Sequence, residues 1–387
     1  MPEFAYLILG GGMTAAAAAK GIREVDGAGK IGILAAESHR PYARPPLSKA
    51  LWTQGKPEES VWLELPQGVE FLAGRRAVAI DRGAHSVTDD RGDRHRYGKL
   101  LLATGGTPRR LPFGKDVIYF RTLDDYRNLR SLDKERVAVI GGGFIGSEIA
   151  AALAQNGKKV TMVFPENGVC ARAFPADLTD FVTGYYREKG VDVRAGESVT
   201  GIERTSVVTK NGRIDADAIV AGIGIAPSTE LAKQAGLTVT DGIEVDKALR
   251  TSDRDIFAAG DLANFHNPAL GKRIRVEHED NANTMGAAAG RSMAGAEVRY
   301  DHLPFFYSDL FDLGYEAVGE IDARHRTVAD WKTPFREGVV YYLQDERVRG
   351  VLLWNTWGQV DNARADRRSE AARRSARAPP ALTRAAR

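Results

Sequence analysis

The chain has 387 residues, 43% of them hydrophobic and 27% charged, with 41 glycines but only 16 prolines. This balance indicates a globular protein of two or three domains with many tight backbone turns, rather than a disordered one. The formal net charge is +3, but residues 364–387 carry eight arginines against two acids, +6, which leaves −3 for the rest. The basic pI therefore belongs to the tail, and nucleic acid is not expected as a partner.

Cysteine use and the N-terminal segment bear on the cellular compartment. Cys170 is the only cysteine, so no intrachain disulfide and no CxxC site can form, which fits a reducing environment. The first residues run into a glycine motif without the basic start of a signal peptide. No apolar run approaches the ~18–20 residues that span a membrane, and no histidine spacing indicates a metal site. We therefore expect a soluble, cytoplasmic protein.

A nucleotide-binding fingerprint opens the chain. The apolar residues 6–9 predict a strand, and an alanine-rich helix is predicted after the glycines that follow. Gly10, Gly12 and Ala15 fit the pattern GxGxxG/A, which allows a tight turn, a close approach of the backbone to a pyrophosphate, and close packing of helix on strand. A second predicted strand leads to Glu37, 22 residues after Ala15, where an acid accepts hydrogen bonds from an adenosine ribose.

The stretch "RPYARPPLSKAL", residues 40–51, follows this unit. Proline fixes φ and pushes the preceding residue toward extended geometry, so Arg44 and Lys49 are expected to point in fixed directions. An arginine can bind a phosphate through two N–H groups, and a surface ion pair is the alternative for Arg44. For Lys49, the residues alone favour an ordinary solvated loop lysine.

The fingerprint recurs in residues 136–166, "RVAVIGGGFIGSEIAAALAQNGKKVTMVFPE". Here Gly141, Gly143 and Gly146 fit the motif, and Glu166 comes 20 residues after Gly146. A single glycine motif is a weak signal, but two motifs, each with strand, turn, helix, strand and terminal acid, are a strong one. The sequence therefore predicts an α/β fold with two Rossmann-like dinucleotide-binding domains.

Two dinucleotide folds in one chain suggest that one cofactor reduces the other. The natural pair is a tightly held flavin, FAD, and a visiting nicotinamide dinucleotide. Glu166 favours NADH, because a carboxylate repels the 2′-phosphate of NADPH. Lys158, Lys159 and Arg172 lie close to it in sequence and weaken this preference.

The C-terminal part contains a predicted hairpin and an unusual tail. Residues 338–354 carry two apolar runs around "QDER", which predicts a β-hairpin. Residues 363–387 consist mostly of Ala, Arg, Pro and Ser, and are predicted to be disordered. Binding of an acidic partner or membrane surface by this tail is the alternative.

Further motifs resemble a known family. "LLLATGGTP" (residues 100–108) and "TSDRDIFAAGDLANF" (residues 251–265) resemble the flavin-domain motifs of two-dinucleotide flavoprotein reductases. Within that group, "RPYARPPLSKALW", "VEHEDNANTMGAAAG" and "FFYSDLFDLGYEAVGE" resemble apoptosis-inducing factor and its bacterial relatives, with ferredoxin and rubredoxin reductases slightly more distant. The resemblance covers about residues 5–357.

The resemblance implies the domain organisation. The expected fold is that of glutathione reductase-like FAD/NAD(P) proteins with a small α+β C-terminal domain. A discontinuous FAD-binding domain would take residues 1–112 and 235–300, with an NAD(H)-binding domain inserted at 113–234. The C-terminal domain would take residues 301–358, and residues 359–387 would form the disordered basic tail.

The resemblance also assigns roles to side chains. It places Lys49 beside the reactive edge of the flavin, where the ammonium stabilises negative charge on the reduced ring. Glu148 would hold that ammonium and order the nicotinamide; plain helix-dipole electrostatics is its alternative. Glu277 and His278 map beside the pyrimidine end of the flavin, with a structural hydrogen bond as the alternative for the histidine. The candidate FAD ligands are Gly10, Gly12, Ala15, Glu37, Arg44, Lys49, Thr104, Gly105, Gly260, Asp261, Glu277 and His278.

An aromatic pair maps to the nicotinamide. Phe306 and Tyr307 occupy positions that in the family stack on nicotinamide or shield the flavin, and simple core packing is the alternative. Tyr307 stands where the family usually has tryptophan, which puts the strength of stacking in doubt. The candidate NAD ligands are Gly141, Gly143, Gly146, Glu148, Glu166, Arg172, Phe306 and Tyr307.

The cysteine count restricts the reaction. Many relatives carry a redox-active disulfide or a peroxide-reactive cysteine near the flavin, and the matching region here has none. We therefore expect hydride transfer from NADH to FAD, followed by electron delivery to an external acceptor such as a quinone, a dye, oxygen or a small carrier. The alternatives are a dedicated ferredoxin or rubredoxin reductase, and an NADH-sensing, redox-regulated homodimer with little turnover.

Overall fold

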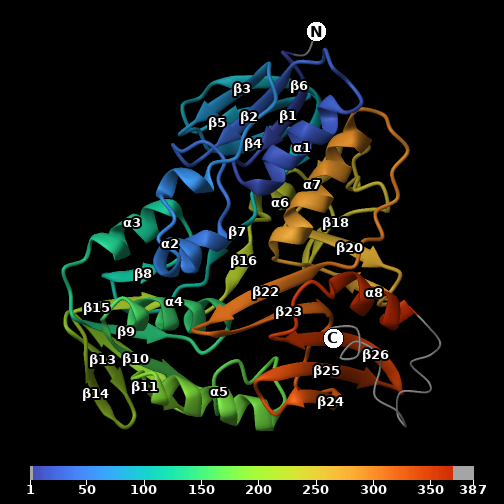
Figure 1. Cartoon of the computed structure of the whole chain (residues 1–387). Helices are drawn as coiled ribbons and strands as arrows, with labels where there is room; N and C mark the ends of the chain where they lie inside the picture. Colours follow the sequence, from blue (N-terminus) through green and yellow to red (C-terminus); the bar gives the residue numbers. More distant parts are fainter. Residues whose placement is uncertain (1–2, 369–387) are drawn as a thin grey trace. The chain divides into compact units, whose positions relative to one another are not determined.

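The structure is a computed structural model that describes residues 3–368 and forms two compact units (Figure 1). The chain passes between the units in two short strands, β7 (Gly106–Pro108) and β16 (Ile225–Pro227), which pair with each other. The first unit comprises the chain up to Arg44 together with Glu59–Thr107 and Ala226–Pro304; the second comprises Pro45–Glu58, Pro108–Ile225 and the chain from Phe305.

These boundaries lie close to the expected domain limits but differ in two ways. Residues 45–58, expected within the flavin domain, pack with the second unit. The segment expected as a separate C-terminal domain is grouped with the nicotinamide region in that same unit. The division into three domains stays a prediction.

A mostly parallel sheet organises the first unit. Its strands run in the order β3-β2-β1-β6, continue into the antiparallel β5 and β4, and include β19 beside β6. The apolar runs of β1 and β2 are buried almost throughout, as expected for parallel strands covered on both faces. A smaller sheet has the order β17-β18-β20-β21. The strands are β1 (Phe4–Leu9), β2 (Ile31–Ala35), β3 (Val69–Ala73), β4 (Ala77–Asp81), β5 (Ser86–Asp89), β6 (Arg94–Leu102), β17 (Val239–Thr240), β18 (Gly242–Glu244), β19 (Ile256–Ala258), β20 (Ala263–Asn267) and β21 (Lys272–Ile274).

Two helices rich in small residues pack together in this unit. Helix α1 (Met13–Arg23) follows β1, and α7 (Glu279–Met293) runs beside it (Figure 1). A Cβ atom built on Gly290 would lie 2.1 Å from the carbonyl oxygen of Ala18, so only glycine fits there. The short helix α6 (Glu230–Gln234) and the 3₁₀ turn Glu58–Val61 complete the helical elements.

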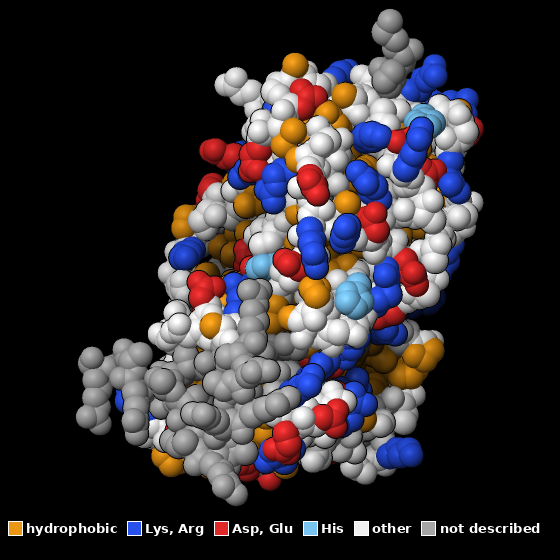
Figure 2. Space-filling view, turned by 90° about the vertical axis from the view of Figure 1, so that its right-hand side faces the viewer, with side chains coloured by type: hydrophobic (Ala, Val, Ile, Leu, Met, Phe, Trp, Pro, Cys, Tyr) orange, Lys and Arg blue, Asp and Glu red, His pale blue; other side chains and the backbone are white. Residues whose placement is uncertain are grey.

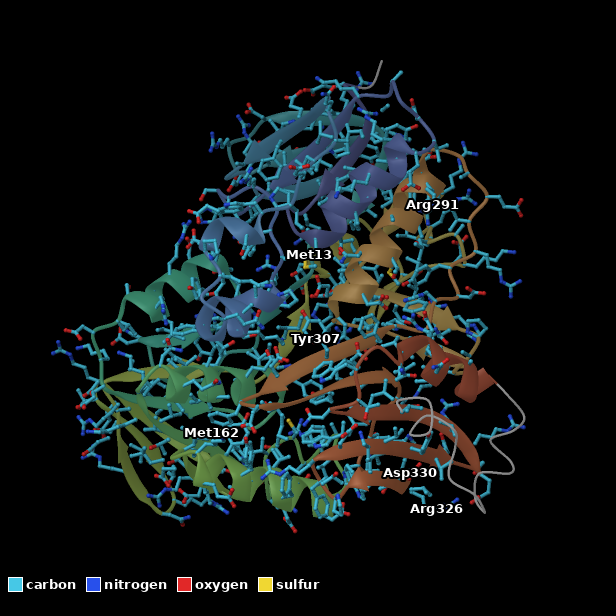
Figure 3. The ribbon with its side chains drawn as sticks, in the orientation of Figure 1. Met13, Met162, Arg291, Tyr307, Arg326 and Asp330 are labelled. Atoms are coloured by element: carbon cyan, nitrogen blue, oxygen red, sulfur yellow. The ribbon has the colours of Figure 1, made fainter. Side chains whose placement is uncertain are left out.

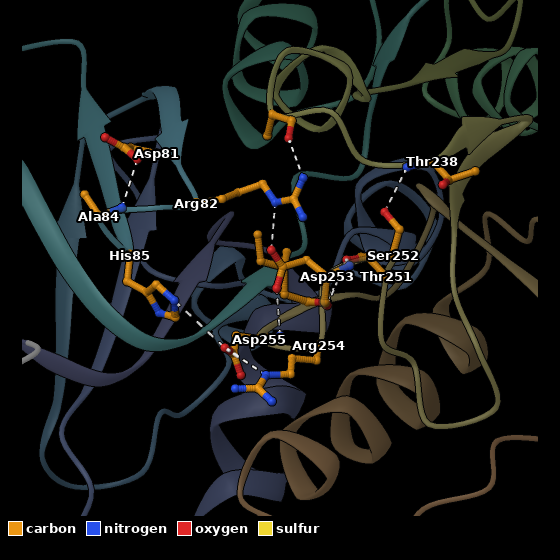
Figure 4. A network of polar contacts seen from close by, with 12 residues as sticks. Asp81, Arg82, Ala84, His85, Thr238, Thr251, Ser252, Asp253, Arg254 and Asp255 are labelled. Atoms are coloured by element: carbon orange, nitrogen blue, oxygen red, sulfur yellow. Dashed lines mark hydrogen bonds and ion pairs between the residues drawn. The ribbon is translucent and has the colours of Figure 1, made fainter.

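A polar network fixes the approach to β19 (Figure 4). The Arg82 Nε atom, on the β4–β5 turn, lies 2.7 Å from the Asp253 carboxylate, and Arg82 also donates to the carbonyl of Ala235 at 3.2 Å. Asp255 lies near the His85 imidazole and the Arg254 guanidinium, at 3.9 and 3.8 Å. The network therefore ties the strand that leads to Gly260 and Asp261 to the sheet.

The second unit contains a parallel five-stranded sheet in the order β11-β10-β9-β15-β8 and a three-stranded antiparallel sheet, β12-β13-β14. Helix α3 begins with a reciprocal capping box between Thr122 and Asp125, which satisfies two backbone N–H groups. The elements are η1 (Pro45–Ser48), α2 (Ala50–Thr53), β8 (Val117–Tyr119), α3 (Leu123–Ser131), β9 (Arg136–Ile140), α4 (Phe144–Gln155), β10 (Lys159–Phe164), α5 (Ala176–Glu188), β11 (Asp192–Ala195), β12 (Val199–Glu203), β13 (Ser206–Thr209), β14 (Gly212–Asp215) and β15 (Ala218–Ala221).

An antiparallel five-stranded sheet of order β22-β23-β26-β25-β24 completes the second unit. It consists of β22 (Phe305–Leu310), β23 (Leu313–Gly319), β24 (Arg326–Thr333), β25 (Glu337–Gln344) and β26 (Arg347–Trp354). The hairpin predicted in residues 338–354 is confirmed, because β25 and β26 pair antiparallel around Asp345 and Glu346. Both turn residues have positive φ, +51° and +57°.

The predicted tail departs from the structure at its start. Residues Val360–Arg368 form helix α8, which packs on β26 and β23, and the side chain of Ala363 is fully buried. The Arg364 guanidinium lies 5.5 Å from the ring centre of Phe305. The expectation of disorder from residue 359 is therefore wrong for this helix, whose first turns have a small residue to bury. Residues 369–387 lie outside the described residues.

Candidate active site

The turn between β1 and α1 forms an open cradle. Gly10 has φ +114°, and a Cβ atom there would lie 2.2 Å from the Ala103 carbonyl oxygen, so the turn requires glycine. A Cβ atom on Gly12, in contrast, would meet nothing within 4 Å among the described residues. Gly12 is the N-cap of α1 (Met13, labelled in Figure 3, is its first residue), and among the described residues no side chain caps the helix. Its first N–H groups are therefore available to a phosphate.

The turn between β9 and α4 repeats this geometry. Gly141 has φ +116°, and its Cβ would lie 2.5 Å from the Gly222 carbonyl oxygen. Gly143 is the N-cap of α4; among the described residues, a Cβ atom on it would again meet nothing within 4 Å, and no side chain caps the helix. The third position is small in both turns: Ala15 is fully buried, and a Cβ on Gly146 would lie 2.1 Å from the Gly141 oxygen. Each fingerprint thus builds a phosphate cradle.

Glu37 follows β2 and is held by two neighbours. The Tyr42 hydroxyl donates to Glu37 Oε2 at 2.5 Å, and the Arg44 guanidinium lies 2.6 Å from Oε1. Burial lowers the pKa of Arg44, but Tyr42, Glu37 and then Asp261 outweigh it, so the net pKa is raised. The structure therefore brings Glu37 and Arg44 together. Tyr42 was missed, although its place between two prolines in "RPYARPP" signals a fixed direction.

Thr104 and Gly105 lie just after β6. The Thr104 hydroxyl donates to the Ser228 carbonyl at 3.3 Å, and the Ser228 N–H donates to the Gly105 carbonyl at 2.9 Å. Gly105 has φ +64°, a conformation that favours glycine. These two candidate ligands thus tie the outgoing and returning segments of the first unit together.

Gly260 and Asp261 follow β19. A Cβ atom on Gly260 would lie 2.4 Å from the Thr14 hydroxyl, in the first turn of α1. This contact brings the second flavin motif next to the first cradle. The carbonyl of Asp261 accepts a hydrogen bond from Arg275 at 3.1 Å, so Asp261 has its backbone fixed beside α1.

Glu277 and His278 precede α7. The Arg275 guanidinium also binds the Glu277 carboxylate, which is one-third exposed. Burial lowers the pKa of Arg275, but Glu277 and Asp241 raise it above its usual value. His278 is the N-cap residue of α7 and has extended backbone geometry. Its position is that of a helix start, which leaves its role toward a flavin as a prediction.

Lys49 and Glu148 form an ion pair in the second unit. The Lys49 Nζ atom lies 2.8 Å from Glu148 Oε2, and the two side chains are only 8% and 3% exposed. Lys49 lies between η1 and α2, and Glu148 lies in the second turn of α4 rather than its first. Ser48 and Ser308 each donate to this carboxylate at 2.6 Å. These two serines were not anticipated, although Ser48 adjoins Lys49 and Ser308 adjoins Tyr307.

The aromatic pair lies on β22 beside this ion pair. The Lys49 ammonium is 5.2 Å from the ring centre of Tyr307, a cation–π contact (Figure 3 labels Tyr307). The Phe306 ring contacts Phe144 at 5.2 Å between centroids, so it packs against the start of α4. Tyr307 is thus placed with the charged pair, and Phe306 with the second cradle.

Glu166 follows β10 and pairs with an exposed arginine. The Arg172 guanidinium lies 2.5 Å from Glu166 Oε1, and its side chain is 86% exposed, against 23% for Glu166. The structure therefore pairs Glu166, which favours NADH, with Arg172, which weakens that preference. Lys159 pairs instead with Glu135, and Lys158 donates to the Leu132 carbonyl.

Cys170 is buried beneath the second cradle. Its backbone N–H donates to the Gly142 carbonyl at 2.7 Å, and its Sγ atom lies 3.7 Å from the Ser147 hydroxyl. Burial raises the pKa of the thiol to about 12, with a smaller contribution from Glu148. The thiolate is therefore disfavoured at neutral pH, so this cysteine is a poor nucleophile.

Both cradles fit a dinucleotide. Each has an open glycine at the N-terminus of a helix and an acid after the neighbouring strand, which are the groups that hold pyrophosphate and ribose. The assignment of the first cradle to FAD and of the second to a nicotinamide dinucleotide stays a prediction. Two such cradles, one beside a buried lysine–glutamate pair, define a two-dinucleotide flavoprotein oxidoreductase.

The chain belongs to the pyridine nucleotide-disulphide oxidoreductase family, whose profile matches residues 4–286. The profile of the mitochondrion-associated C-terminal region of apoptosis-inducing factor matches residues 289–334. As in other members of this pyridine-nucleotide family, the cofactors are FAD and a nicotinamide dinucleotide. With its single cysteine, the chain carries out this oxidoreductase chemistry without an intrachain disulfide.

Relatives and solved structures agree with this assignment. Apoptosis-inducing factor 1 of Dictyostelium discoideum is 32% identical, over 94% of this chain and 78% of its own. Putidaredoxin reductase CamA of Pseudomonas putida is 33% identical, over 89% of this chain and 87% of its own. Among solved structures, the covalent putidaredoxin reductase–putidaredoxin complex matches with a TM-score of 0.89 and 31% identity, over 95% of this chain and 94% of that one. The α/β fold with two dinucleotide-binding domains is confirmed.

The described part of the chain has neither a metal-binding cluster nor a membrane-spanning helix. Across residues 3–368, no cluster of His, Cys, Asp and Glu side chains has the arrangement of a metal site. In the same range, no helix has the length and hydropathy to cross a membrane.

Proposed function

We propose that this protein oxidises NADH and passes the electrons to a small iron–sulfur carrier of the ferredoxin type. The observation that carries the proposal is the buried Lys49–Glu148 pair at the second cradle, in a chain whose only thiol is buried, with its pKa raised by that burial. Such a chain offers no internal disulfide as acceptor, so the electrons must leave to an external one. Support comes from ferredoxin-reductase relatives that match the chain over 84% or more of its length.

The chain's own residues prepare the transfer. FAD, when bound, supplies a ring that takes a hydride from NADH and releases its electrons one at a time. Gly12 and the N-terminus of α1 bind its pyrophosphate, while Glu37, oriented by Arg44, accepts hydrogen bonds from its ribose. Lys49 carries the positive charge that stabilises a reduced, anionic ring. Glu148 holds that ammonium and orients the nicotinamide amide.

The NAD(H) side of the proposal rests on the second cradle. Gly143 and the N-terminus of α4 bind the pyrophosphate, and Glu166 accepts hydrogen bonds from the adenosine ribose. Because the Arg172 side chain is largely exposed, it can move away from Glu166. The freed carboxylate can then bind the ribose of NADH and repel the 2′-phosphate of NADPH. We propose NADH as the preferred donor.

Surface charge gives limited guidance on the acceptor. A small acidic carrier docks best on a basic surface. On the face drawn in Figure 2, Lys and Arg side chains are interspersed with Asp and Glu. Charge on that face therefore does not single out a docking surface. Measured rates of flavin reoxidation by different acceptors are needed to identify the acceptor.

A second candidate function is supported by one observation, the match of residues 289–334 to the C-terminal region of apoptosis-inducing factor. In this alternative, the protein is reduced by NADH, reoxidises slowly, and changes its dimerisation. Sedimentation of the purified protein with and without NADH under anaerobic conditions tests it. An NADH-induced shift in mass with negligible carrier reduction would favour this alternative.

The main proposal is tested by anaerobic titration of the purified protein. We expect the purified protein to contain FAD. NADH should bleach the flavin absorbance at concentrations well below the NADPH concentrations that have the same effect. A ferredoxin-type carrier should then reoxidise the flavin faster than a quinone, a dye or oxygen does. Well-folded protein that neither contains nor takes up flavin would defeat the proposal. A cytoplasmic location belongs to it as well, and cell fractionation checks it.

A further inference from the structure

We propose that Ser48 and Ser308 are positioning residues that clamp the Glu148 carboxylate and, through it, fix the Lys49 ammonium. The Ser48 hydroxyl donates to Oε2 of Glu148 at 2.6 Å, and the Ser308 hydroxyl donates to Oε1 at 2.6 Å. Lys49 Nζ adds a third contact, 2.8 Å from Oε2. The inference rests on the proposed function, in which Lys49 and Glu148 serve hydride transfer.

Burial makes these two hydroxyls matter. Ser48, Lys49, Glu148 and Ser308 are all at most 8% exposed, and all belong to the second unit. A buried ion pair recovers its desolvation cost only if further hydrogen bonds satisfy the remaining lone pairs. Lys49 Nζ lies 2.8 Å from Oε2, and the Ser308 hydroxyl donates to Oε1, the other carboxylate oxygen. Without it, that oxygen would be a buried acceptor lacking its partner.

The spacing of helix and strand explains how Ser308 reaches Glu148. Phe144 and Glu148 are four residues apart on α4, about 6 Å along the helix. Phe306 and Ser308 are two residues apart on one face of β22, about 6.6 Å along the strand. The aromatic contact between Phe144 and Phe306 therefore places Glu148 opposite Ser308.

The other arm of the clamp is rigid for a different reason. Two prolines start the 3₁₀ turn η1 (Pro45–Ser48), and the Trp52 indole N–H donates to the Leu47 carbonyl at 2.6 Å. Ser48 and Lys49 are consecutive, and both contact the same carboxylate oxygen. Consecutive residues on β22 act likewise, because Tyr307 contacts Lys49 while Ser308 contacts Glu148. Two dipeptides thus hold one ion pair from two sides.

Other titratable groups face the pair and shape its response to pH. Burial raises the pKa of Asp309 on β22; the Lys49 charge opposes this, and the Glu148 charge adds a smaller increase. Cys170, Tyr186 on α5 and Tyr315 on β23 all have raised pKa values, mainly through burial, and Glu148 contributes to each. The thiol and the two tyrosine hydroxyls are therefore neutral near pH 7 and add no positive charge beside Glu148. The groups that offset the Glu148 charge are thus the two serine donors and Lys49.

The test compares Ser48→Ala, Ser308→Ala and the double variant with wild type, as purified holoenzymes. The first measurement is the acetylation rate of Lys49 by an N-hydroxysuccinimide acetate reagent, read by peptide mass spectrometry. We expect about tenfold faster labelling in Ser308→Ala, since loss of a hydrogen bond to a charged group frees the pair. Ser308→Thr, which keeps the hydroxyl, should restore the slow rate.

The second measurement is the pH profile of flavin reduction by NADH in a single turnover. Loss of the two hydroxyl donors loosens the ion pair that fixes the Lys49 ammonium, so the profile of the alanine variants should differ from that of wild type. The matched control is Ser292→Ala, which removes an equally buried hydroxyl that donates to the Ala248 carbonyl at 2.8 Å in the first unit. It should change neither the labelling of Lys49 nor the profile.

The outcomes separate this inference from the proposed function. Wild-type labelling and an unmoved profile in the double Ser48→Ala, Ser308→Ala variant would overturn the clamp. Faster labelling in that variant, combined with normal flavin reduction in Glu148→Gln, would support the clamp and overturn the assigned role of the ion pair in hydride transfer.

Discussion

Substitutions of Lys49 and Glu148 should separate the stability of the fold from the rate of flavin reduction. Lys49→Met would leave the Glu148 charge buried beside two serines, and breaking a buried pair costs about 3–5 kcal/mol. We expect the free energy of unfolding to fall by roughly 3 kcal/mol. Lys49→Met/Glu148→Gln removes both charges and should regain most of it. Urea denaturation measures both values.

The same two variants should differ little in rate. Both lack the ammonium that stabilises the reduced ring, so both should be reduced by NADH at least about tenfold more slowly than wild type in stopped-flow absorbance. A double variant that regains wild-type rate along with stability would contradict the role assigned to Lys49. A single variant as stable as wild type would contradict the energetic importance of the pair.

A second residue-scale prediction concerns Arg44. Its guanidinium lies 2.6 Å from Glu37 and fixes the acid that we assign to the ribose. Arg44→Met should weaken FAD binding about tenfold, because a charge-assisted hydrogen bond is lost. The release of fluorescent flavin on dilution measures it. The matched control is Arg40→Met, a neighbouring arginine over the Trp62 ring, and equal flavin loss in both would contradict the assignment.

Sequence reasoning at this scale reached some residues and missed others for identifiable reasons. Glu37 and Glu166 could be proposed as ribose ligands because an acid after the second strand has a fixed spacing from the glycines. Lys49 could be proposed only through the family resemblance. Ser48 and Ser308 were missed because their partner, Glu148, is 100 and 160 residues away. Such a contact depends on tertiary packing, which no local pattern records.

At the scale of elements, the two glycine turns can be dissected with matched substitutions. A Cβ atom at Gly143 would meet open space among the described residues. At Gly141, it would lie 2.5 Å from a carbonyl oxygen, and the backbone there has a φ of +116°. Gly143→Val should therefore fold, keep FAD, and bind NADH at least about tenfold more weakly, because the side chain fills the cradle. Gly141→Ala should unfold more easily. Calorimetric titration with NADH and thermal melting separate the two effects.

The first cradle supplies the control for this prediction. Gly12→Val places the same side chain in equally open space at the start of α1. It should reduce the FAD content of the purified protein. Loss of FAD in Gly143→Val, or unchanged FAD in Gly12→Val, would contradict the assignment of the cradles to the two cofactors.

Helix α8 leads to a prediction about truncation. A chain ending at Arg368 keeps the helix, including the fully buried Ala363, and should melt like the full chain. A chain ending at Gln359 exposes the surface of β26 that α8 covers, and its melting temperature should fall by about 2–4 °C for each kcal/mol lost. Equal melting of the two truncations would show that α8 contributes nothing to stability.

At the scale of the whole molecule, the repeated fingerprint correctly predicted two parallel sheets, because buried strands and glycine turns are local signals. The sequence predicted a discontinuous first unit, but it did not predict that residues 45–58 belong to the second unit. Residues 45–58 pack with the second unit through contacts such as Trp52 with Tyr126, 5.4 Å between ring centres. Nothing in the composition of "PPLSKALW" distinguishes that packing from packing in the first unit. The start of the tail was misjudged because arginine-rich sequence concealed an alanine that a helix could bury.

The charge network of the folded molecule also predicts its acid sensitivity. Burial raises the pKa of Asp89, but Arg75, His95 and the backbone N–H groups of Arg91 and Asp93 together bring it well below the usual value. Arg75 and His95 lie 2.7 and 3.1 Å from the carboxylate. Because the pKa is lower in the folded state, the stabilisation is complete above the unfolded value near 4 and is lost as the pH falls below it.

Replacing this carboxylate should therefore flatten the pH dependence of stability. Asp89→Asn should lower the melting temperature by several degrees at pH 7, and by less as the pH approaches about 3, where the wild-type carboxylate is losing its advantage. Differential scanning calorimetry across this range measures the difference. Asp116→Asn, at an exposed aspartate, is the control and should melt like wild type at every pH. A constant difference between Asp89→Asn and wild type from pH 7 to about 3 would mean that this stabilisation comes from packing and not from the ionised carboxylate.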